Sequence, residues 1–545
     1  MQKHFTLCFI LMLFLIPVAY SQSGYFSGAF QSNTNFFVRD VKIGAYNMPQ
    51  YDNYKVGTDA WLNLDYNNEK YGLDIGVRFD FFYNSILRVP TSPYTGAGLG
   101  IFYVRKKIKD LTITAGYLYD QIGTGILYRS YEERTLGIDN ALLGARLQYD
   151  VSSKLRLKAF GGVQKLQFSY LNPIILGFNA DGNFTTKDTK TTFQPGVGVI
   201  DRSMDQATMN QIVSTIESYD TSGRFVPKYN TYAFTAYNTI SGHGFSWYVE
   251  GAYKTAEAIP INEIRQVIDS LIYAPGNIVY TTLNYSKPGL GITAQFQRVQ
   301  NFYLHVSPNP SASQFDNTMN FIPPVSRENS LRLPSRYFAP SLESRQLAFS
   351  AEVTYSPINK VTLTFSGSYI RDFLLKRFDP TDSTFFAEGF VSALFKPSHN
   401  FEFELGFQYA RYDKFLYQNE GSPVVNAYTP FGEFLYKFNH KTSYRMEFQY
   451  QNVIQDYGQW LYALAELNIA PHFSFSVSDM WNFKPNPEVN PYANHYYSLF
   501  VGYTLGATNF TLAYVKQVEG IVCTGGVCRL EPAFSGAKFG VTSIF

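Results

Sequence analysis

Two of the chain's three cysteines lie close together near its end, in the stretch IVCTGGVC at 521–528. Cys523 and Cys528 flank Gly525 and Gly526, and glycine permits the positive φ that a tight reversal needs. In a hairpin the two thiols would lie opposite each other, within reach of a disulfide. The alternative is a metal or redox pair, but two cysteines fall short of the four ligands of a structural zinc site, and the spacing is not C-x-x-C. We therefore predict a disulfide, with no metal and no cofactor.

A second candidate site is the segment 120–140, in which acidic and basic residues are concentrated. Gly123 and Gly125 would let this segment bend sharply. If it folds into a lumen, its charges could form a constriction that selects solutes by charge. Alternatively, its arginines pair with its glutamates and brace the surrounding wall. The candidate residues are Asp120, Arg129, Glu132, Glu133, Arg134 and Asp139.

The remaining chemistry-bearing residues argue against an enzyme and against nucleic-acid binding. A hydrolase needs a general base beside a nucleophile, but the histidines are scattered. The formal net charge is only +2, so no nucleic-acid partner is expected. The histidines after the N-terminal segment are His243, His305, His399, His440, His472 and His495.

Long β-strands are the elements that would position these residues. Along FEFELGFQY (401–409), Phe, Leu and Tyr alternate with Glu, Gly and Gln, which gives a strand one apolar and one polar face. Similar alternation occurs in 73–83, 444–451 and 472–481. These runs of roughly 9–13 residues end in aromatic residues, as transmembrane barrel strands do. Because lipid offers no hydrogen-bond partners, such a sheet must close on itself.

The connections between the strands alternate in length. Ten short turns and eleven mostly longer connections can be placed, which requires 22 strands and puts both chain ends on the short-turn side. The predicted fold is an all-β, antiparallel, up-and-down transmembrane barrel with an even number of strands, between 18 and 22, and 22 as the best estimate.

Two of the longer connections contain amphipathic helix patterns. In 205–218, apolar residues recur at i, i+3, i+4 and i+7, and Asp205 can cap the start. The segment 261–271 carries a similar stripe of Ile and Leu. Such helices could plug the lumen, dock a partner or pack on the rim. We expect the connection 169–230 to be where any protein partner binds.

The N-terminus is typical of an exported protein. Residues 1–21 combine a basic start, an apolar run and small residues around a cleavage site, and are predicted to be a signal peptide. An exported chain reaches compartments where disulfides persist. Strand-like sequence begins at Tyr25, so we expect 22–545 to be one barrel domain without a separate plug.

Three stretches carry resemblances. The ending AFSGAKFGVTSIF resembles the last strand of outer-membrane barrels, which their assembly machinery binds; Phe539, Val541 and Phe545 carry this likeness. The stretches 114–149 and 525–536 resemble an uncharacterised Bacteroidota family of large, porin-like outer-membrane β-barrels. This resemblance implies the fold and a location in the outer membrane of a Gram-negative bacterium, and it implies no activity.

These observations predict a barrel in contact with outer-membrane lipid that acts as a porin-like channel for small solutes. The charged segment 120–140 would lie near the lumen. The lumen would be either open or occluded by the loops 169–230 and 306–343. The alternative is a non-transporting scaffold or accessory protein of a surface assembly or secretion system.

Overall fold

The computed structural model describes residues 24–545 except 90–91, 189, 264–265, 309–316, 373–382, 419–423, 490–491 and 525–526; the side chains of 261–270 and 521–530 are also left out. The predicted signal peptide, residues 1–21, lies outside the described residues.

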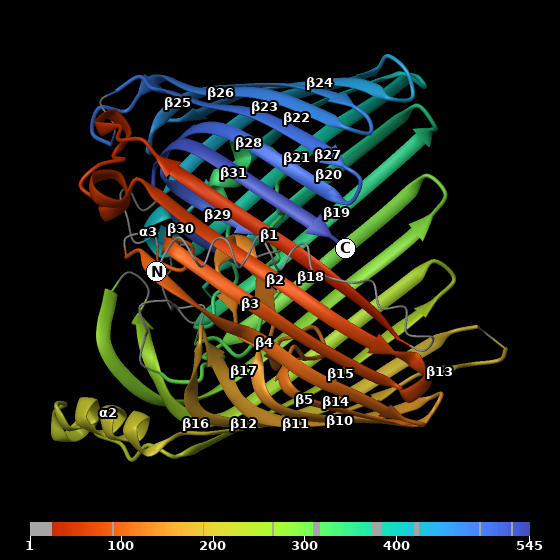
Figure 1. Ribbon diagram of the computed structural model, residues 1–545, viewed down its shortest axis with the longest axis vertical. Helices are drawn as coiled ribbons and strands as arrows, with labels where there is room; N and C mark the ends of the chain where they lie inside the picture. The colour runs from red at the N-terminus through yellow and green to blue at the C-terminus, as the bar shows by residue number, and fades with distance from the viewer. Residues whose placement is uncertain are drawn as a thin grey trace.

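In this described part of the chain, 24 long strands form a closed antiparallel barrel (Figure 1). Each wall strand pairs with the next one along the chain. The first strand, β1 (Tyr25–Phe37), also pairs with the last, β31 (Phe534–Ile544), so the ring has no free edge. The predicted closed, even-numbered antiparallel barrel is confirmed, but its strand number is 24 rather than 22.

The wall strands between β1 and β31 are β2 (Val56–Asn68), β3 (Leu73–Ser85), β4 (Tyr94–Ile108), β5 (Leu111–Leu118), β10 (Leu142–Ser152), β11 (Leu155–Leu166), β12 (Ser169–Gly182), β14 (Thr192–Ser203), β15 (Asn230–Gly242), β16 (Phe245–Glu263), β17 (Gln266–Lys287), β18 (Leu290–Gln300), β19 (Arg345–Ile358), β20 (Val361–Arg371), β21 (Thr384–Ser398), β22 (Phe401–Tyr412), β23 (Val425–Lys437), β24 (Thr442–Val453), β25 (Gly458–Ile469), β26 (Phe473–Pro485), β27 (His495–Leu505) and β28 (Thr508–Gln517).

Short elements occupy the connections: β6 (Gln121–Ile122), β7 (Tyr128–Arg129), β8 (Glu132–Glu133), β9 (Ile138–Asp139), β13 (Phe184–Thr185), β29 (Gly520–Thr524), β30 (Val527–Glu531), α2 (Gln206–Glu217), α3 (Lys414–Gln418), η1 (Val41–Ile43), η2 (Gln50–Tyr54), η3 (Glu69–Tyr71), η4 (Arg134–Leu136), η5 (Thr221–Gly223) and η7 (Pro334–Tyr337).

The two additional wall strands, β12 and β14, lie inside 169–230, so the prediction of a single long loop there is wrong. The reason lies in the inward face of β12. Ile175 points inward and is fully buried, while its neighbours Ile174 and Leu176 are 49% and 52% exposed. Apolar residues therefore follow one another on both faces, and the period of two that marks a barrel strand is hidden.

The two predicted helices have different outcomes. The helix in 205–218 is confirmed as α2, and Asp205 caps it by accepting hydrogen bonds from the backbone nitrogens of Ala207 and Thr208 at 3.1 and 3.3 Å. The helix predicted for 261–271 is wrong, because β16 and β17 extend into this segment and pair there. Its many β-branched residues suit the pleated surface of a sheet.

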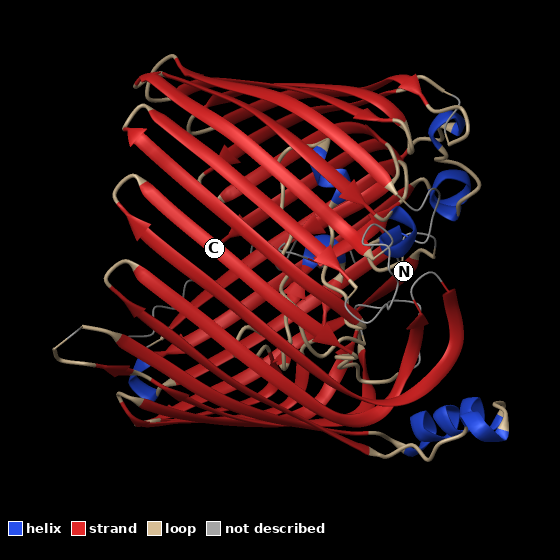
Figure 2. Ribbon diagram, turned by 180° about the vertical axis from the view of Figure 1, so that it is seen from behind, coloured by secondary structure: helices blue, strands red, loops and turns tan. Residues whose placement is uncertain are grey.

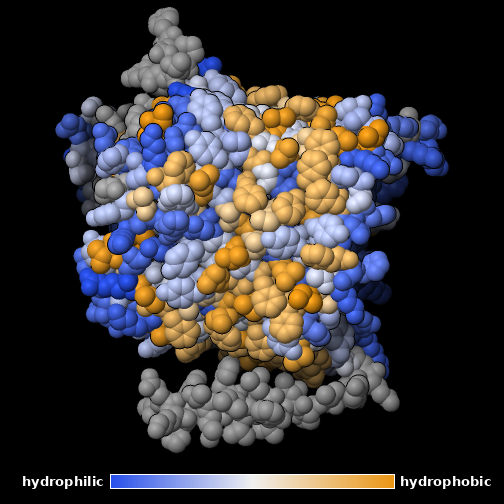
Figure 3. All heavy atoms as spheres, turned by 90° about the horizontal axis from the view of Figure 1, so that it is seen from above, coloured by the Kyte–Doolittle hydropathy of each residue, from blue (hydrophilic) through white to orange (hydrophobic). Residues whose placement is uncertain are grey.

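The wall strands alternate between an exposed apolar face and a buried polar face. In β3, Phe79 and Phe81 are 49% and 42% exposed, whereas Arg78 and Asp80 are 3% and 4% exposed. On the face seen in Figure 3, a broad hydrophobic band lies between more hydrophilic edges. None of the described helices is long and apolar enough to cross a membrane.

The two ends of the barrel differ. Tight hairpin turns gather at one end, here called the turn end, and most helical segments lie at the other, the loop end (Figure 2). At the loop end α2 projects beyond the ring of strands (Figure 1). It packs there through Met209, Ile212 and Ile216 against Ala258 of β16 and Leu271 of β17. The helix therefore covers the extended β16–β17 hairpin and does not enter the lumen.

Candidate functional site inside the barrel lumen

Two connections of the loop end fold into the barrel and meet each other. They are residues 119–141, between β5 and β10, and the described residues of 301–344, between β18 and β19; we call them the first and second plug loops. The Arg129 backbone nitrogen donates to the Met319 carbonyl, and that of Phe321 donates to the Gly125 carbonyl, each at 2.9 Å. Of the two loops expected to occlude the lumen, 306–343 lies inside the barrel in its described part, whereas the helix of 169–230 lies outside it. That the lumen is occluded stays a prediction.

Tight turns let the first plug loop enter the lumen. Gly123 and Gly125 have φ angles of +56° and +98°, which side chains with a Cβ rarely adopt. Two small hairpins follow, β6 with β7 and β8 with β9. The predicted sharp bends at these glycines are thus present, and they carry the loop across the lumen.

The tip of the first plug loop buries apolar side chains against the wall. Ile122, Ile126 and Leu127 are completely buried, and Tyr128 is 1% exposed. They belong to one apolar cluster with inward-facing wall residues of β5, β10–β12 and β14–β18: Leu118, Leu142, Phe160, Ile175, Ile200, Ala233, Ala252, Ile278, Tyr280 and Val299. Burial of this kind excludes water along nine of the 24 wall strands.

The second plug loop packs against a neighbouring part of the ring. Val325, Tyr337 and Ala339 cluster with inward residues of β19 to β24. Leu333 is completely buried against Trp460 of β25 and Met480 of β26. The two loops together place an apolar layer against the wall from β5 to β27. Sequence reasoning missed this layer, because it assigned a polar surface to the whole inward face.

A buried ionic cluster holds the far part of the first plug loop to the wall. Arg78 of β3 contacts Asp80, Glu132 and Asp139, at 2.6 Å in each case. Lys165 of β11 also pairs with Asp139. Burial alone would raise the pKa of Asp139, but the positive charges of Lys165 and Arg78 outweigh it and hold that pKa below its ordinary value.

The other predicted site residues also contact their surroundings. Asp120 pairs with Arg146 of β10 at 3.2 Å and with Lys158 of β11 at 2.5 Å. Arg134 pairs with Glu132 at 3.0 Å. These ion pairs match the wall-bracing arrangement.

Two of the site residues depart from the predicted arginine–glutamate pairs. Arg129 lies over the rings of Tyr131 and Phe321, 4.5 Å from each centroid. Glu133 caps η4 by accepting a hydrogen bond from the Thr135 backbone nitrogen at 3.1 Å. A charge-selecting role for the six residues stays a prediction.

Glu250 of β16 anchors the tip of the first plug loop. Its Oε2 accepts hydrogen bonds from the Thr124 hydroxyl at 2.6 Å and from the Thr124 backbone nitrogen at 3.1 Å. The hydroxyls of Tyr248 and Thr235 donate to the same carboxylate at 2.6 and 2.9 Å. All four donors are neutral, and Glu250 is completely buried. Thr124 and Glu250 lie 126 residues apart in sequence, so the pattern of a single strand could not reveal this contact.

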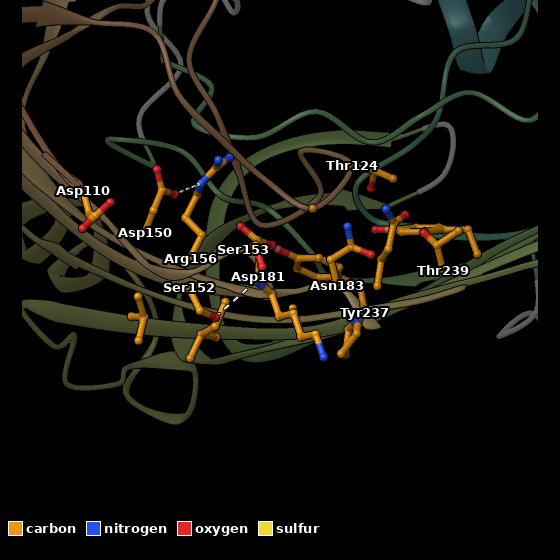
Figure 4. Close-up of a pocket in the computed structure, with 18 residues that line it drawn as sticks. Asp110, Thr124, Asp150, Ser152, Ser153, Arg156, Asp181, Asn183, Tyr237 and Thr239 are labelled. Atoms are coloured by element: carbon orange, nitrogen blue, oxygen red, sulfur yellow. Dashed lines mark hydrogen bonds and ion pairs between the residues drawn. The ribbon is translucent and has the colours of Figure 1, made fainter. Parts of the chain in front are cut away.

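On the turn side of this tip lies a cavity of about 910 Å³. Figure 4 shows its lining, with the ion pair of Asp150 and Arg156 on one side and Thr124, Tyr237 and Thr239 on the other. The pair is 2.6 Å apart. The cavity is thus a polar space between the plug and the turn end.

The cysteine pair and the C-terminal strand lie outside this site. Cys523 is opposite Cys528 in the β29–β30 hairpin, as predicted, but their side chains lie outside the described residues, so the disulfide stays a prediction. In β31, Phe539 is 41% exposed, and the terminal Phe545 exchanges backbone hydrogen bonds with Gly28 of β1 at 2.7 and 2.9 Å. The assembly role proposed for Phe539, Val541 and Phe545 is not tested by these contacts.

Fold and site define a class: a large closed β-barrel with an apolar outer surface and a lumen filled by its own loops. Over residues 1–545 the chain matches the model of a family described as a family of unknown function, DUF6029, and it belongs to that family. Membership in a Bacteroidota group stays a prediction. No curated protein matches the chain.

Several solved barrels are similar in fold. The siderophore receptor PirA from Pseudomonas aeruginosa is 9% identical, with a TM-score of 0.41 over 95% of this chain and 80% of that one. The translocation pore of the P pilus usher PapC is 7% identical, with a TM-score of 0.45 over 95% and 99%. OccK5 (OpdH) from Pseudomonas aeruginosa is 10% identical, with a TM-score of 0.36 over 72% and 94%.

Proposed function

We propose that this protein is an outer-membrane barrel that passes small solutes and is closed at rest by its two plug loops. A ring of 24 strands encloses a lumen far wider than its own wall side chains can fill. The exposed aromatic and aliphatic band suits lipid, and ring closure removes the unpaired backbone groups that lipid would penalise. These features support a location in the outer membrane of a Gram-negative bacterium.

The observation that carries the proposal is the complete burial of the plug-loop tip above a large polar cavity. Ile122, Ile126 and Leu127 fill their part of the lumen with buried apolar side chains, while the space on their turn side stays open to solutes. Water and ions cross apolar constrictions poorly, so the barrel is closed while this tip is in place. Displacing the tip would join the cavity to the loop end.

Single-channel recording in planar bilayers tests this proposal. Residues 121–139 are replaced by a short Gly-Ser linker, which can span the gap because Leu118 pairs with Leu142 at the base of the loop. We expect the intact barrel to be nearly silent and the variant to show steady openings whose conductance rises with salt. Deleting 169–230 is unsuitable, because it would remove β12 and β14 from the wall.

The matched control replaces residues 205–228 by the same linker. Ser203 pairs with Asn230, so this gap is equally short, but the removed helix lies outside the lumen. We expect this control to stay as silent as the intact barrel. A first-loop deletion that folds, judged by its strand content in circular dichroism, and yet conducts nothing would contradict the channel.

A second candidate, the non-transporting scaffold, is favoured by one observation. The β16–β17 hairpin and α2 project from the loop end, where they present a surface that lumen closure does not require (Figure 1). A scaffold would remain silent after deletion of the first plug loop, and a photo-cross-linker at Gln211 on the exposed side of α2 would capture a protein partner in cells.

A further inference from the structure

The cavity on the turn side of the plug has the size and position of a ligand site. Its volume of about 910 Å³ is at the upper end of the range for small-molecule pockets, roughly 300–1,000 Å³. Ser153, Lys154 and Asn183 of its lining are exposed at the turn end. A solute can therefore enter from that end while the plug stays in place.

The charges of the lining nearly balance. Asp150 is neutralised by Arg156 at 2.6 Å, and Asp181 accepts a hydrogen bond from the Tyr237 hydroxyl. Lys154 and Asp110 contribute one further charge of each sign. A strongly charged solute would gain little from such a lining, because no single sign dominates.

The rest of the lining is rich in hydroxyl and amide groups. Hydroxyls and amides both donate and accept hydrogen bonds, so they match a ligand that carries many hydroxyls of its own. These residues come from the plug-loop tip, from two hairpins of the turn end and from β15: Thr124, Ser152, Ser153, Asn183, Gln194 and Thr239.

Two tyrosine rings form a fixed aromatic surface in the same cavity. Tyr237 of β15 and Tyr248 of β16 have ring centroids 6.4 Å apart and planes tilted by 33°. The Tyr237 hydroxyl accepts from the Asn179 side chain at 2.8 Å, and its ring covers Gly196, where an added Cβ would lie 2.2 Å from ring carbons. Held at its hydroxyl and on one ring face, Tyr237 is preorganised, which lowers the entropic cost of binding.

We infer that this cavity binds a neutral, hydroxyl-rich solute of the sugar class. The flat tyrosine faces contact the apolar C–H face of a sugar ring, and the surrounding hydroxyls and amides bind its hydroxyl groups. This inference deepens the proposed channel function and names the class of solute for the same lumen. Tyr248 and Thr124 both donate to Oε2 of Glu250, so a sugar on Tyr248 lies next to the contact that anchors the plug.

Isothermal titration calorimetry of the detergent-solubilised full barrel tests the site with sucrose, raffinose and maltotriose as probes. We expect saturable binding of at least one of them, and weaker or no binding of glutamate, lysine and inorganic phosphate. No saturable binding of any of the three sugars would overturn the inference. Tighter binding of a charged probe than of every sugar would overturn the solute class.

Three variants locate the binding. Tyr237→Leu removes the aromatic face and is expected to weaken sugar binding about tenfold. Thr239→Trp fills part of the cavity with bulk and is expected to abolish binding. The matched control is Tyr253→Leu, because Tyr253 lies on the outer face of β16 with 50% exposure and binding should be unchanged. Unchanged binding in both cavity variants would place the sugar elsewhere and overturn the site.

The test of sugar binding and the test of the channel can give different answers. Because the cavity lies on the turn side of the plug, sugar binding needs no conduction. A barrel that binds sugar but stays silent after deletion of 121–139 would keep the site and contradict the channel. A conducting deletion variant whose intact parent binds no sugar would keep the channel and contradict the site.

Discussion

The far part of the first plug loop and the centre of the second are held in the lumen by different chemistry. The first is fixed by buried ion pairs, with Arg78 and Lys165 of the wall facing Asp139. The second is fixed at its centre by neutral groups. Buried wall glutamines bind the backbone of Leu333: Gln449 Oε1 accepts from its nitrogen at 2.8 Å, and Gln451 Nε2 donates to its carbonyl at 3.1 Å.

This difference shows that one barrel can hold the loops in its lumen by two different chemistries. Buried ion pairs depend on every partner being present, because an unpaired buried charge is costly. Apolar packing with amide hydrogen bonds depends on shape and is insensitive to charge. Substitutions aimed at one chemistry should therefore release one loop and leave the other in place.

The largest effect is expected from Arg78→Ala. It leaves Asp80, Glu132 and Asp139 without their shared guanidinium, at a cost of about 3–5 kcal/mol. Hydrogen exchange should show faster opening of the first plug loop only. The control is Arg105→Ala, because Arg105 is 43% exposed and lies 3.8 Å from Asp74; its effect should stay below about 1 kcal/mol. Equal release of both loops by Arg78→Ala would contradict their independence.

Leu333→Ala is expected to have the next largest effect. It opens a cavity beside Trp460 and Met480 and should cost about 2–5 kcal/mol, measured as faster hydrogen exchange around η7 in the second plug loop. Leu405→Ala, on the outer face with 57% exposure, serves as the control and should leave this exchange unchanged. If hydrogen exchange in Leu333→Ala became faster in the first plug loop instead, the packing of the two loops would not be independent.

Thr124→Val removes one hydrogen bond to Glu250 and should have a smaller effect. The backbone bond from residue 124 to Glu250 remains, so the expected loss is about 1 kcal/mol. Planar-bilayer recording should show brief openings more often than in the intact barrel. Thr135→Val is the control within the same loop, because the Thr135 hydroxyl bonds to Glu133 at an exposed position. Identical opening frequencies in both variants would exclude Glu250 as the anchor of the tip.

The smallest expected effect is a pH dependence confined to the second plug loop. His305 Nε2 lies 2.9 and 3.0 Å from the two carboxylate oxygens of Glu343, which ties together the two ends of that loop. Burial would lower the pKa of His305, but the negative charges of Glu343 and, more weakly, Glu257 outweigh burial and the nearby positive Lys254 and raise it.

A raised pKa means that the folded loop holds the proton more tightly than the unfolded chain does. The stabilisation is therefore complete below about pH 6.5, the unfolded value, and is lost as the pH rises through the folded value. Protease cleavage within the second plug loop, scaled to a reference peptide at each pH, should be slower at pH 6 than at pH 9. His305→Gln should abolish this difference; a difference that persists in this variant would assign it to another group.

Much of the wall could be predicted from local sequence, because the alternation of apolar and polar residues along each strand indicates which face points outward. In β3 the alternation predicts that Phe79 and Phe81 point outward and that Arg78 and Asp80 point inward. The structure confirms this arrangement. The prediction failed at β12, where Ile175 faces an apolar plug instead of water. It failed again at 261–271, where a stripe of Ile and Leu suits a helix and a strand equally.

The candidate site could be predicted only in part. The charges and glycines of 120–140 marked the loop that enters the lumen, and Asp205 marked the start of α2. The partners of these charges could not be predicted. Arg78 lies 54 residues before Glu132, and Thr124 lies 126 residues before Glu250, so their contacts exist only once the ring has closed.

By itself the sequence determined that this chain is a closed ring of antiparallel strands with an apolar outer face. Period-two alternation is a local property of each strand. An apolar outer face in lipid requires closure, because lipid cannot hydrogen-bond unpaired backbone groups. Only the tertiary structure decided what occupies the middle of the ring. Residues from distant strands come together in the apolar packing around Ile122 and Leu333, in the Arg78 ion cluster and in the lining of the polar cavity. These contacts depend on burial that no single strand provides.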